Sequence, residues 1–163
     1  MRIKKVAFTL LILILALSVM APGLNVPGYN SLRSGQTVEF TAGRAGVSFV
    51  LSSFDGTVKI TRRSTNKAPG EEKPRFTQNL LDVRLTDKDG KTVTHVLGSV
   101  YIYFKVRQKD IRMWEQGELS IYLFDTWKQE WVPCRTYAVR DGSSISNLAC
   151  RIRVFGLYGV AAK

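Results

Sequence analysis

The residues with most capacity for chemistry are two cysteines, Cys134 and Cys150. Zinc sites take several Cys or His ligands, and His95 is the only histidine of the chain. The spacing of the cysteines is also far from the Cys-x-x-Cys pattern of redox motifs. In an oxidising compartment a disulfide between them is therefore the first expectation, with two unpaired buried thiols as the alternative.

A hairpin would bring the two cysteines together. Asp141-Gly142-Ser143 is a strong turn signal, and a fold about Gly142 places Cys134 opposite Cys150. In that register Val132 faces Ile152 and Thr136 faces Leu148, on a largely apolar face. The opposite face then carries polar and aromatic side chains: Trp131, Arg135, Tyr137, Asn147, Arg151 and Arg153. Closing this loop with a disulfide would stabilise the fold by roughly 3 kcal/mol.

Other catalytic or metal-binding patterns are weak. His95 has no second His or Cys near it in the sequence, which favours a partly exposed strand residue. Asp87-x-Asp89-Gly90 resembles the start of a calcium loop, but the later acidic ligands of an EF-hand are missing, so a hairpin turn is expected. The chain contains no Gly-x-Ser-x-Gly or Ser-x-x-Lys element. We therefore expect no enzymatic activity, no cofactor and no metal.

Three tryptophans and two arginines are the candidate ligand-binding residues: Trp114, Trp127, Trp131, Arg151 and Arg153. Trp127 and Trp131 bracket a predicted hairpin turn, and aromatic side chains on an exposed loop can stack on sugars or anchor at an interface. Packing is the alternative, in which Trp131 lies over Arg153 across the hairpin as a cation–π pair.

The charge balance favours anionic neighbours. The chain has 24 Lys and Arg against 13 Asp and Glu, a formal net charge of +11. It has no block of five or six basic residues, which favours solvated charge scattered over the surface, and nucleic acid is not the expected partner. An envelope or extracellular protein, or a polysaccharide, is the expected partner.

The first 23 residues have the pattern of an export signal. A basic start (Arg2, Lys4, Lys5) precedes an uncharged apolar run at 6–20. This run is shorter than the roughly 20 residues of a membrane-spanning helix, so 1–23 is predicted to be a signal peptide, or an N-terminal anchor if it stays uncleaved. The membrane would then be contacted only through this segment, and an extracytoplasmic location is expected.

The remainder, 24–163, is expected to be a single antiparallel β-sandwich. Alternating segments such as 99–107 place apolar residues on one face and Tyr101, Tyr103 and Lys105 on the other. Turn signals recur every 8 to 15 residues, as in sandwiches or barrels. Asp55-Gly56 predicts a hairpin between the strands at 46–54 and 56–63, and 150–160 a closing strand with Ile152 and Val154 inward. The segment 62–78, rich in Pro and charge, is expected to be a long solvated loop or a crossover joining two halves.

The order of these motifs resembles a known group of modules. GRAGVSFVLSSFDGTVKIT resembles the opening of ZU5-type domains, and the segment from Glu118 to Ala162 is similar to the ending of UPA and GPS-type modules. The resemblance implies a β-sandwich with a structural, adhesive or interaction role on secreted or surface proteins.

Some of those modules cleave themselves at a His-Phe-Ser or His-Leu-Thr tripeptide. Carried over, Trp131, Cys134 and Cys150 match the family's Trp and two cysteines, and the tripeptide falls on 154–156, which reads Val-Phe-Gly here. The base and the nucleophile are both replaced, and self-cleavage needs a hydroxyl or thiol beside a base. The resemblance therefore implies a non-catalytic module, either structural or protein-binding, with glycan or anionic polymer binding as the alternative.

Overall fold

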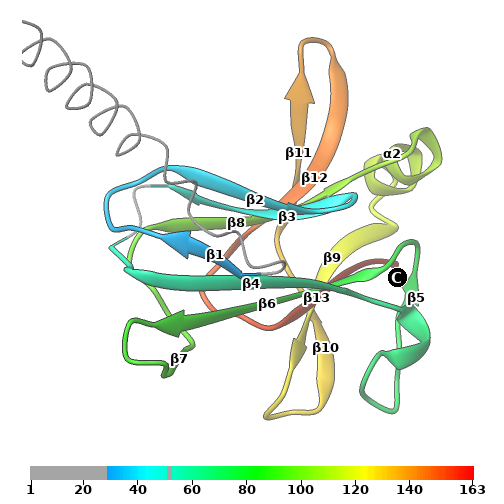
Figure 1. Cartoon of the computed structure of the whole chain (residues 1–163). Helices are drawn as coiled ribbons and strands as arrows, with labels where there is room; N and C mark the ends of the chain where they lie inside the picture. The colour runs from blue at the N-terminus through cyan, green and yellow to red at the C-terminus, as the bar shows by residue number, and fades with distance from the viewer. Residues whose placement is uncertain (1–28, 51–52) are drawn as a thin grey trace, which may run out of the picture.

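Two antiparallel sheets pack against each other in the computed structural model, which describes residues 29–50 and 53–163 (Figure 1). The predicted all-β sandwich is confirmed. The predicted signal segment at 1–23 lies outside the described residues. Within the described ranges, no helix is both long enough and apolar enough to cross a membrane.

The larger sheet, sheet A, is built around one continuous path of strands. In order across the sheet these are β1 (Tyr29–Leu32), β4 (Gly56–Arg63), β6 (Leu80–Asp87), β13 (Leu157–Ala162), β9 (Leu119–Asp125) and β10 (Glu130–Pro133). Two short strands lie off this path: β5 (Arg75–Phe76) pairs with β13, and β7 (Thr92–Val93) pairs with β6.

The second sheet, sheet B, has five strands among the described residues. Their order is β11 (Thr136–Asp141), β12 (Ser144–Ile152), β8 (Ser99–Lys105), β3 (Ala45–Val50) and β2 (Val38–Ala42). The helix α2 (Gln108–Glu115) follows β8 at one end of the sandwich, and the β11–β12 hairpin projects beyond the layers (Figure 1). A single 3-10 turn, η1 (Thr65–Lys67), follows β4.

Strand alternation separates the core from the outer faces. On β8, Val100, Ile102 and Phe104 are buried between the sheets, as predicted. Phe49 from sheet B and Tyr158 from sheet A are also fully enclosed. Burying each such side chain contributes about 1.5–3 kcal/mol, which makes the space between the layers the main source of stability.

The predicted hairpin at Asp55-Gly56 is wrong. β3 pairs with β2 and β8 in sheet B, whereas β4 pairs with β1 and β6 in sheet A, so the chain crosses between the layers here. Val47 of β3 and Val58 of β4 are both fully buried. Two strands facing each other across a core show the same apolar alternation as two neighbours in one sheet, and the pattern cannot separate the cases.

The closing segment 150–160 is two strands in different sheets. β12 ends at Ile152 in sheet B, and β13 begins at Leu157 in sheet A. Phe155 in the crossover stacks on Phe49 with ring centroids 6.0 Å apart. Val154 is 38% exposed, so its predicted inward position is wrong, because the strand has already ended there.

The segment 62–78 is less solvated than predicted. It contains the end of β4, η1 and β5, and Ala68 within it is buried. The backbone oxygen of Pro69 accepts a hydrogen bond of 3.0 Å from the indole nitrogen of Trp131. This segment therefore covers part of the outer face of sheet A.

Candidate functional site

A hollow lies on the outer face of sheet B. We call it the outer groove, and its volume is about 880 Å³. It is lined by side chains from all five strands of the sheet and from the residue before β11: Glu39, Ser48, Tyr101, Tyr103, Arg135, Tyr137, Val139, Asn147, Ala149 and Arg151.

The groove exists because tall and short side chains alternate across neighbouring strands. Tyr103 of β8 is paired with Gly46 of β3 on one side and with Ala149 of β12 on the other. Residues directly opposite each other in a sheet project from the same face. The small residues therefore leave space beside the Tyr103 ring, and the sheet surface is hollowed there.

Gly46 lets Tyr103 lie across β3 toward β2. A Cβ atom at position 46 would come within 3.0 Å of the Tyr103 ring and hydroxyl, and also of the backbone oxygen of Phe40. In this position Tyr103 donates a short hydrogen bond to the carboxylate of Glu39. Burial, followed by the hydrogen bond and negative charge of Glu39, raises the pKa of Tyr103 well above its usual value. Glu39 is the only carboxylate among the described residues that line the outer groove, and it is hydrogen-bonded to Tyr103.

Tyr101 and Tyr137 form the aromatic part of the groove. Their rings meet edge to face, with centroids 6.2 Å apart and planes at 87°. Burial, with smaller effects from Tyr101 and Cys150, raises the pKa of Tyr137 to about 12. The phenol is thus neutral at physiological pH, and its ring packs against Tyr101.

Two enclosed polar atoms of the groove residues have no hydrogen-bond partner among the described residues. They are the hydroxyl of Tyr137 and the side-chain oxygen of Asn147. Leaving such a group unpaired costs about 1–3 kcal/mol. Arg135 and Arg151 add two positive charges to the same lining. The groove therefore combines aromatic surface, polar side chains and an excess of positive charge.

Of the residues singled out in the sequence, only Arg151 lines this groove. Arg153 is exposed beyond the end of β12. Trp114 lies on α2 and packs, half-buried, against the core. Trp127 is 96% exposed in the turn between β9 and β10, which extends away from sheet B (Figure 1). The tertiary structure therefore disperses these residues.

Trp131 is a packing residue. It is only 9% exposed, and its ring lies 4.7 Å from that of Phe76 and 5.3 Å from that of Phe124, centroid to centroid. It pairs with Phe124 within sheet A, so the predicted cation–π contact across a hairpin with Arg153 is wrong. The chain reaches sheet B only after Pro133, which removes Trp131 from the predicted hairpin.

The two cysteines are neighbours, although not by the predicted register. Cys150 is paired with Thr136, and Leu148 with Ala138, a shift of two residues. The two-residue turn Gly142–Ser143 and a bulge after Val139 account for the shift. Because the shift is even, the same residues stay on each face.

Cys134 stands where the chain passes from sheet A to sheet B. Its backbone N–H donates to Ile121 of β9 over 2.7 Å, while Cys150 is buried in sheet B. Both thiols are free in the structure and interact with each other. This contact lowers the pKa of Cys134 and, together with burial, raises that of Cys150. A disulfide between them remains a prediction, and it would join the two sheets.

The remaining motifs of the sequence are turn features. The Asp87 carboxylate accepts hydrogen bonds from the backbone of Asp89 (2.9 Å) and Lys91 (2.8 Å), which confirms a hairpin turn there. His95 is exposed and follows β7 instead of lying within a strand; its ring contacts Thr94 Oγ1 at 2.8 Å. Over the described residues, no group of three or more His, Cys, Asp or Glu could hold a metal ion.

Apart from Arg151, the groove residues were not candidates in the sequence, and the most important of those missed are Glu39, Tyr101, Tyr103, Arg135 and Tyr137. A usable signal was present, since Tyr101 and Tyr103 were assigned to one solvent face, and Tyr137, Asn147 and Arg151 to another. The sequence does not show that β8 and β12 are adjacent strands, which is established by the pairing of Tyr103 with Ala149. Adjacency merges two separate polar faces into one site.

Comparison with known proteins adds no relative from which a site could be transferred. The chain matches no protein-family model, no curated protein and no solved structure. The site therefore rests on the geometry of this chain alone.

Proposed function

We propose that this chain is a non-catalytic, extracytoplasmic β-sandwich module that binds an acidic polysaccharide in the outer groove. The observation that carries the proposal is the joint lining of the groove by Tyr101, Tyr137, Arg135 and Arg151. Aromatic rings offer apolar surface to the faces of sugars, and guanidinium groups bind carboxylates through paired hydrogen bonds.

The polar side chains of the groove support a ligand rich in hydroxyl groups. Ser48 and Asn147 line the groove beside the tyrosines, and hydroxyl and amide groups exchange hydrogen bonds with sugar hydroxyls. Glu39, the one groove carboxylate described, is already engaged by Tyr103, which reduces its repulsion of an acidic ligand. An acidic sugar polymer offers ring faces to the tyrosines, hydroxyl groups to the polar side chains and carboxylates to the arginines of the groove.

The proposed location rests on the leader and the cysteines. A basic start followed by an apolar run at 6–20 is the pattern of an export signal. Disulfides persist in oxidising compartments, and the contact between Cys134 and Cys150 places two thiols where one could form. Outside the cytoplasm, envelope polysaccharides are abundant ligands of matching charge.

Protein binding is a second candidate, favoured by the edge of sheet B. β11 pairs only with β12 in the described chain, and its hairpin projects from the sandwich (Figure 1). Val139 on this strand is 37% exposed. An unpaired strand edge can accept a strand from a partner protein, which would give the structural or interaction role expected from the sequence.

Affinity electrophoresis of the full chain tests the polysaccharide proposal. Alginate and hyaluronate are acidic probes, and dextran is a neutral control. We expect retardation by the acidic polymers that weakens as salt rises. Arg151→Gln and Tyr101→Ala should weaken it, whereas Arg153→Gln removes an equal charge outside the groove and should not. Equal retardation of the Arg151 and Arg153 variants would show that binding is nonspecific and would reject the groove.

A further inference from the structure

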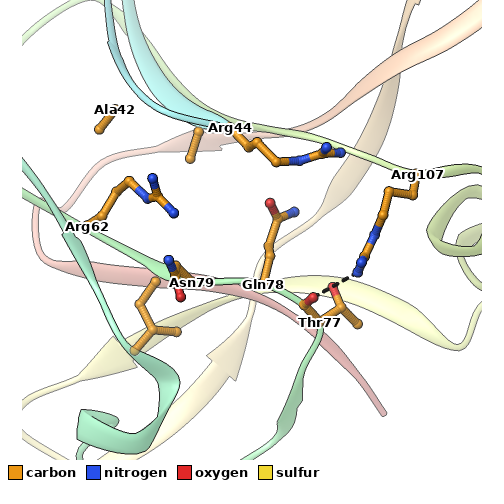
Figure 2. Close-up of a pocket in the computed structure, with 9 residues that line it drawn as sticks. Ala42, Arg44, Arg62, Thr77, Gln78, Asn79 and Arg107 are labelled. Atoms are coloured by element: carbon orange, nitrogen blue, oxygen red, sulfur yellow. Dashed lines mark hydrogen bonds between the residues drawn. The ribbon is translucent and has the colours of Figure 1, made fainter.

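A second cavity, separate from the outer groove, lies at one end of the sandwich (Figure 2). We call it the arginine cavity, and its volume is about 290 Å³. It lies where the turn between β2 and β3, strand β4 and the segment before β6 approach the start of α2. Its polar lining residues are Arg44, Arg62, Thr77, Gln78, Asn79 and Arg107.

Three arginines from three different elements surround this cavity. Arg44 lies in the β2–β3 turn, Arg62 on β4, and Arg107 directly before α2. Figure 2 shows Arg62 reaching in from one side, with Arg44 and Arg107 on the other and the amide of Gln78 between them. Local sequence does not bring these residues together, because 63 positions separate Arg44 from Arg107.

Two of the guanidinium groups are held in place by backbone oxygens. Arg107 Nη2 donates to the carbonyl of Thr77 over 2.9 Å, the bond drawn in Figure 2. Arg44 Nη2 donates to the carbonyl of Lys105 over 3.3 Å. These bonds orient the arginines without neutralising them, since a carbonyl oxygen carries no net charge.

Carboxylates balance only part of the charge. Asp110 pairs with Arg107 through Nε at 3.2 Å, but no Asp or Glu is among the described residues that line the cavity. The side chain of Arg62 forms no hydrogen bond or ion pair with any other residue in the described ranges. The neighbouring Arg63 is the residue of this strand that pairs with Asp82.

The Arg62 side chain lies close against the glycine of the β2–β3 turn. A Cβ atom at Gly43 would lie 2.8 Å from Nη1 of Arg62, which is closer than packed carbon atoms approach. The φ of Gly43 is +67°, a conformation that glycine adopts at little cost. The turn thus leaves space for the guanidinium beside the cavity mouth.

We propose that the arginine cavity binds a tetrahedral oxyanion, a phosphate or sulfate group, either free or carried by a larger ligand. The planar donors of arginine suit oxyanions, which accept several charge-assisted hydrogen bonds at once. Arg62 supplies an unused guanidinium, Arg44 adds charge, and the side-chain amides of Gln78 and Asn79 add neutral donors. No residue lines both this cavity and the outer groove, so this site does not depend on the proposed function.

Thermal melting of the full chain in matched-ionic-strength phosphate, sulfate, acetate and chloride tests the site. An anion that binds the native state raises the melting temperature in a saturable manner. We expect this response to phosphate and sulfate, with acetate and chloride giving none. Arg62→Gln and Arg44→Gln should each weaken phosphate binding about tenfold or more. Arg140→Gln, in the exposed β11–β12 hairpin, removes the same charge elsewhere and should leave the affinity unchanged.

Amide chemical shifts of ¹⁵N-labelled protein provide a second readout that does not depend on the variants. Titrated phosphate should shift the amides of Gln78 and Asn79 and leave those of Tyr137 and Ala149 in place. Saturable shifts confined to the first pair support the site. An equal response of all three arginine variants, an equal response to acetate, or the absence of saturable shifts at Gln78 and Asn79 would overturn it.

Discussion

The ring of Tyr103 occupies the space in which a side chain at Gly46 would begin. The two residues are paired across β3 and β8, and the missing side chain lets Tyr103 reach Glu39 on the next strand. This single relationship shapes the middle of the outer groove and engages its carboxylate.

Gly46→Ala is predicted to destabilise the fold by about 1–3 kcal/mol, since an added methyl group in a packed site forces neighbours to move. The clash includes the backbone oxygen of Phe40, which cannot rotate away. Gly156→Ala is the control, because its Cβ would meet Leu123 at an ordinary 3.7 Å. Urea unfolding measures both, and equal stability of the two variants would contradict the packing of Tyr103 on Gly46.

Two Tyr→Phe substitutions are predicted to have different effects on stability. Tyr103→Phe removes the hydrogen bond to Glu39 and should cost about 1–2 kcal/mol. Tyr137→Phe removes a hydroxyl without a partner among the described residues, and should be neutral or stabilising. Both should be compared by urea unfolding without polysaccharide. A larger loss for Tyr137→Phe than for Tyr103→Phe would reject the hydrogen-bond assignment.

Stability is predicted to fall as the pH rises above 10. Burial raises the pKa values of Tyr103, Tyr122, Tyr137 and Tyr158 from the ordinary 10.0. Above pH 10 the unfolded chain loses these protons while the folded chain keeps them. The unfolded state then binds fewer protons, so the free energy of unfolding decreases with pH, through pH 12 for Tyr137. Melting temperatures and phenolate absorbance across this range test it; ionisation of all six tyrosines near pH 10 with the fold intact would contradict it.

Oxidation of Cys134 and Cys150 to a disulfide is predicted to stabilise the protein by about 3 kcal/mol, because the bond restricts the unfolded chain. For a domain of this size that corresponds to roughly 10 °C in melting temperature. Melts with and without reductant measure the effect. The variant carrying Cys134→Ser and Cys150→Ser should melt at the same temperature in both conditions; an identical pair of melts for the unsubstituted chain would exclude the disulfide.

Trp131→Ala is predicted to cost about 3–5 kcal/mol, the usual loss for a large buried aromatic residue, whereas Trp127→Ala should change stability by less than about 0.5 kcal/mol. Trp131 packs on Phe76 and Phe124, while Trp127 is 96% exposed. Urea unfolding followed by circular dichroism tests the pair. Similar losses of stability in the two variants would contradict the buried position of Trp131 and the exposed position of Trp127.

Several elements follow from local pattern alone. The alternation on β8 places Val100, Ile102 and Phe104 inward, and the structure agrees. The hairpin turn after Asp87 was also predicted, and its carboxylate bonds explain it. These features depend on residues close in sequence, whose preferences for a strand or turn are set by their own side chains.

Other elements were predicted wrongly for a common reason. The hairpin at Asp55-Gly56 and the single closing strand at 150–160 are both crossovers between sheets. In each case residues on both sides of the crossover face the core. Apolar residues at every second position show only which face of a strand is buried. Because both sheets of a sandwich face one shared core, this pattern does not show to which sheet a strand belongs.

The sequence by itself determined the all-β class, the sandwich and the faces of many strands, because burial of apolar side chains imposes a period of two along each strand. Beyond the local hairpins, only the tertiary structure decided which strands are neighbours. It placed Tyr103 between Gly46 and Ala149, moved Trp131 into sheet A and gathered Arg44, Arg62 and Arg107 around one cavity. These placements depend on contacts between residues far apart in the chain, which no local pattern encodes.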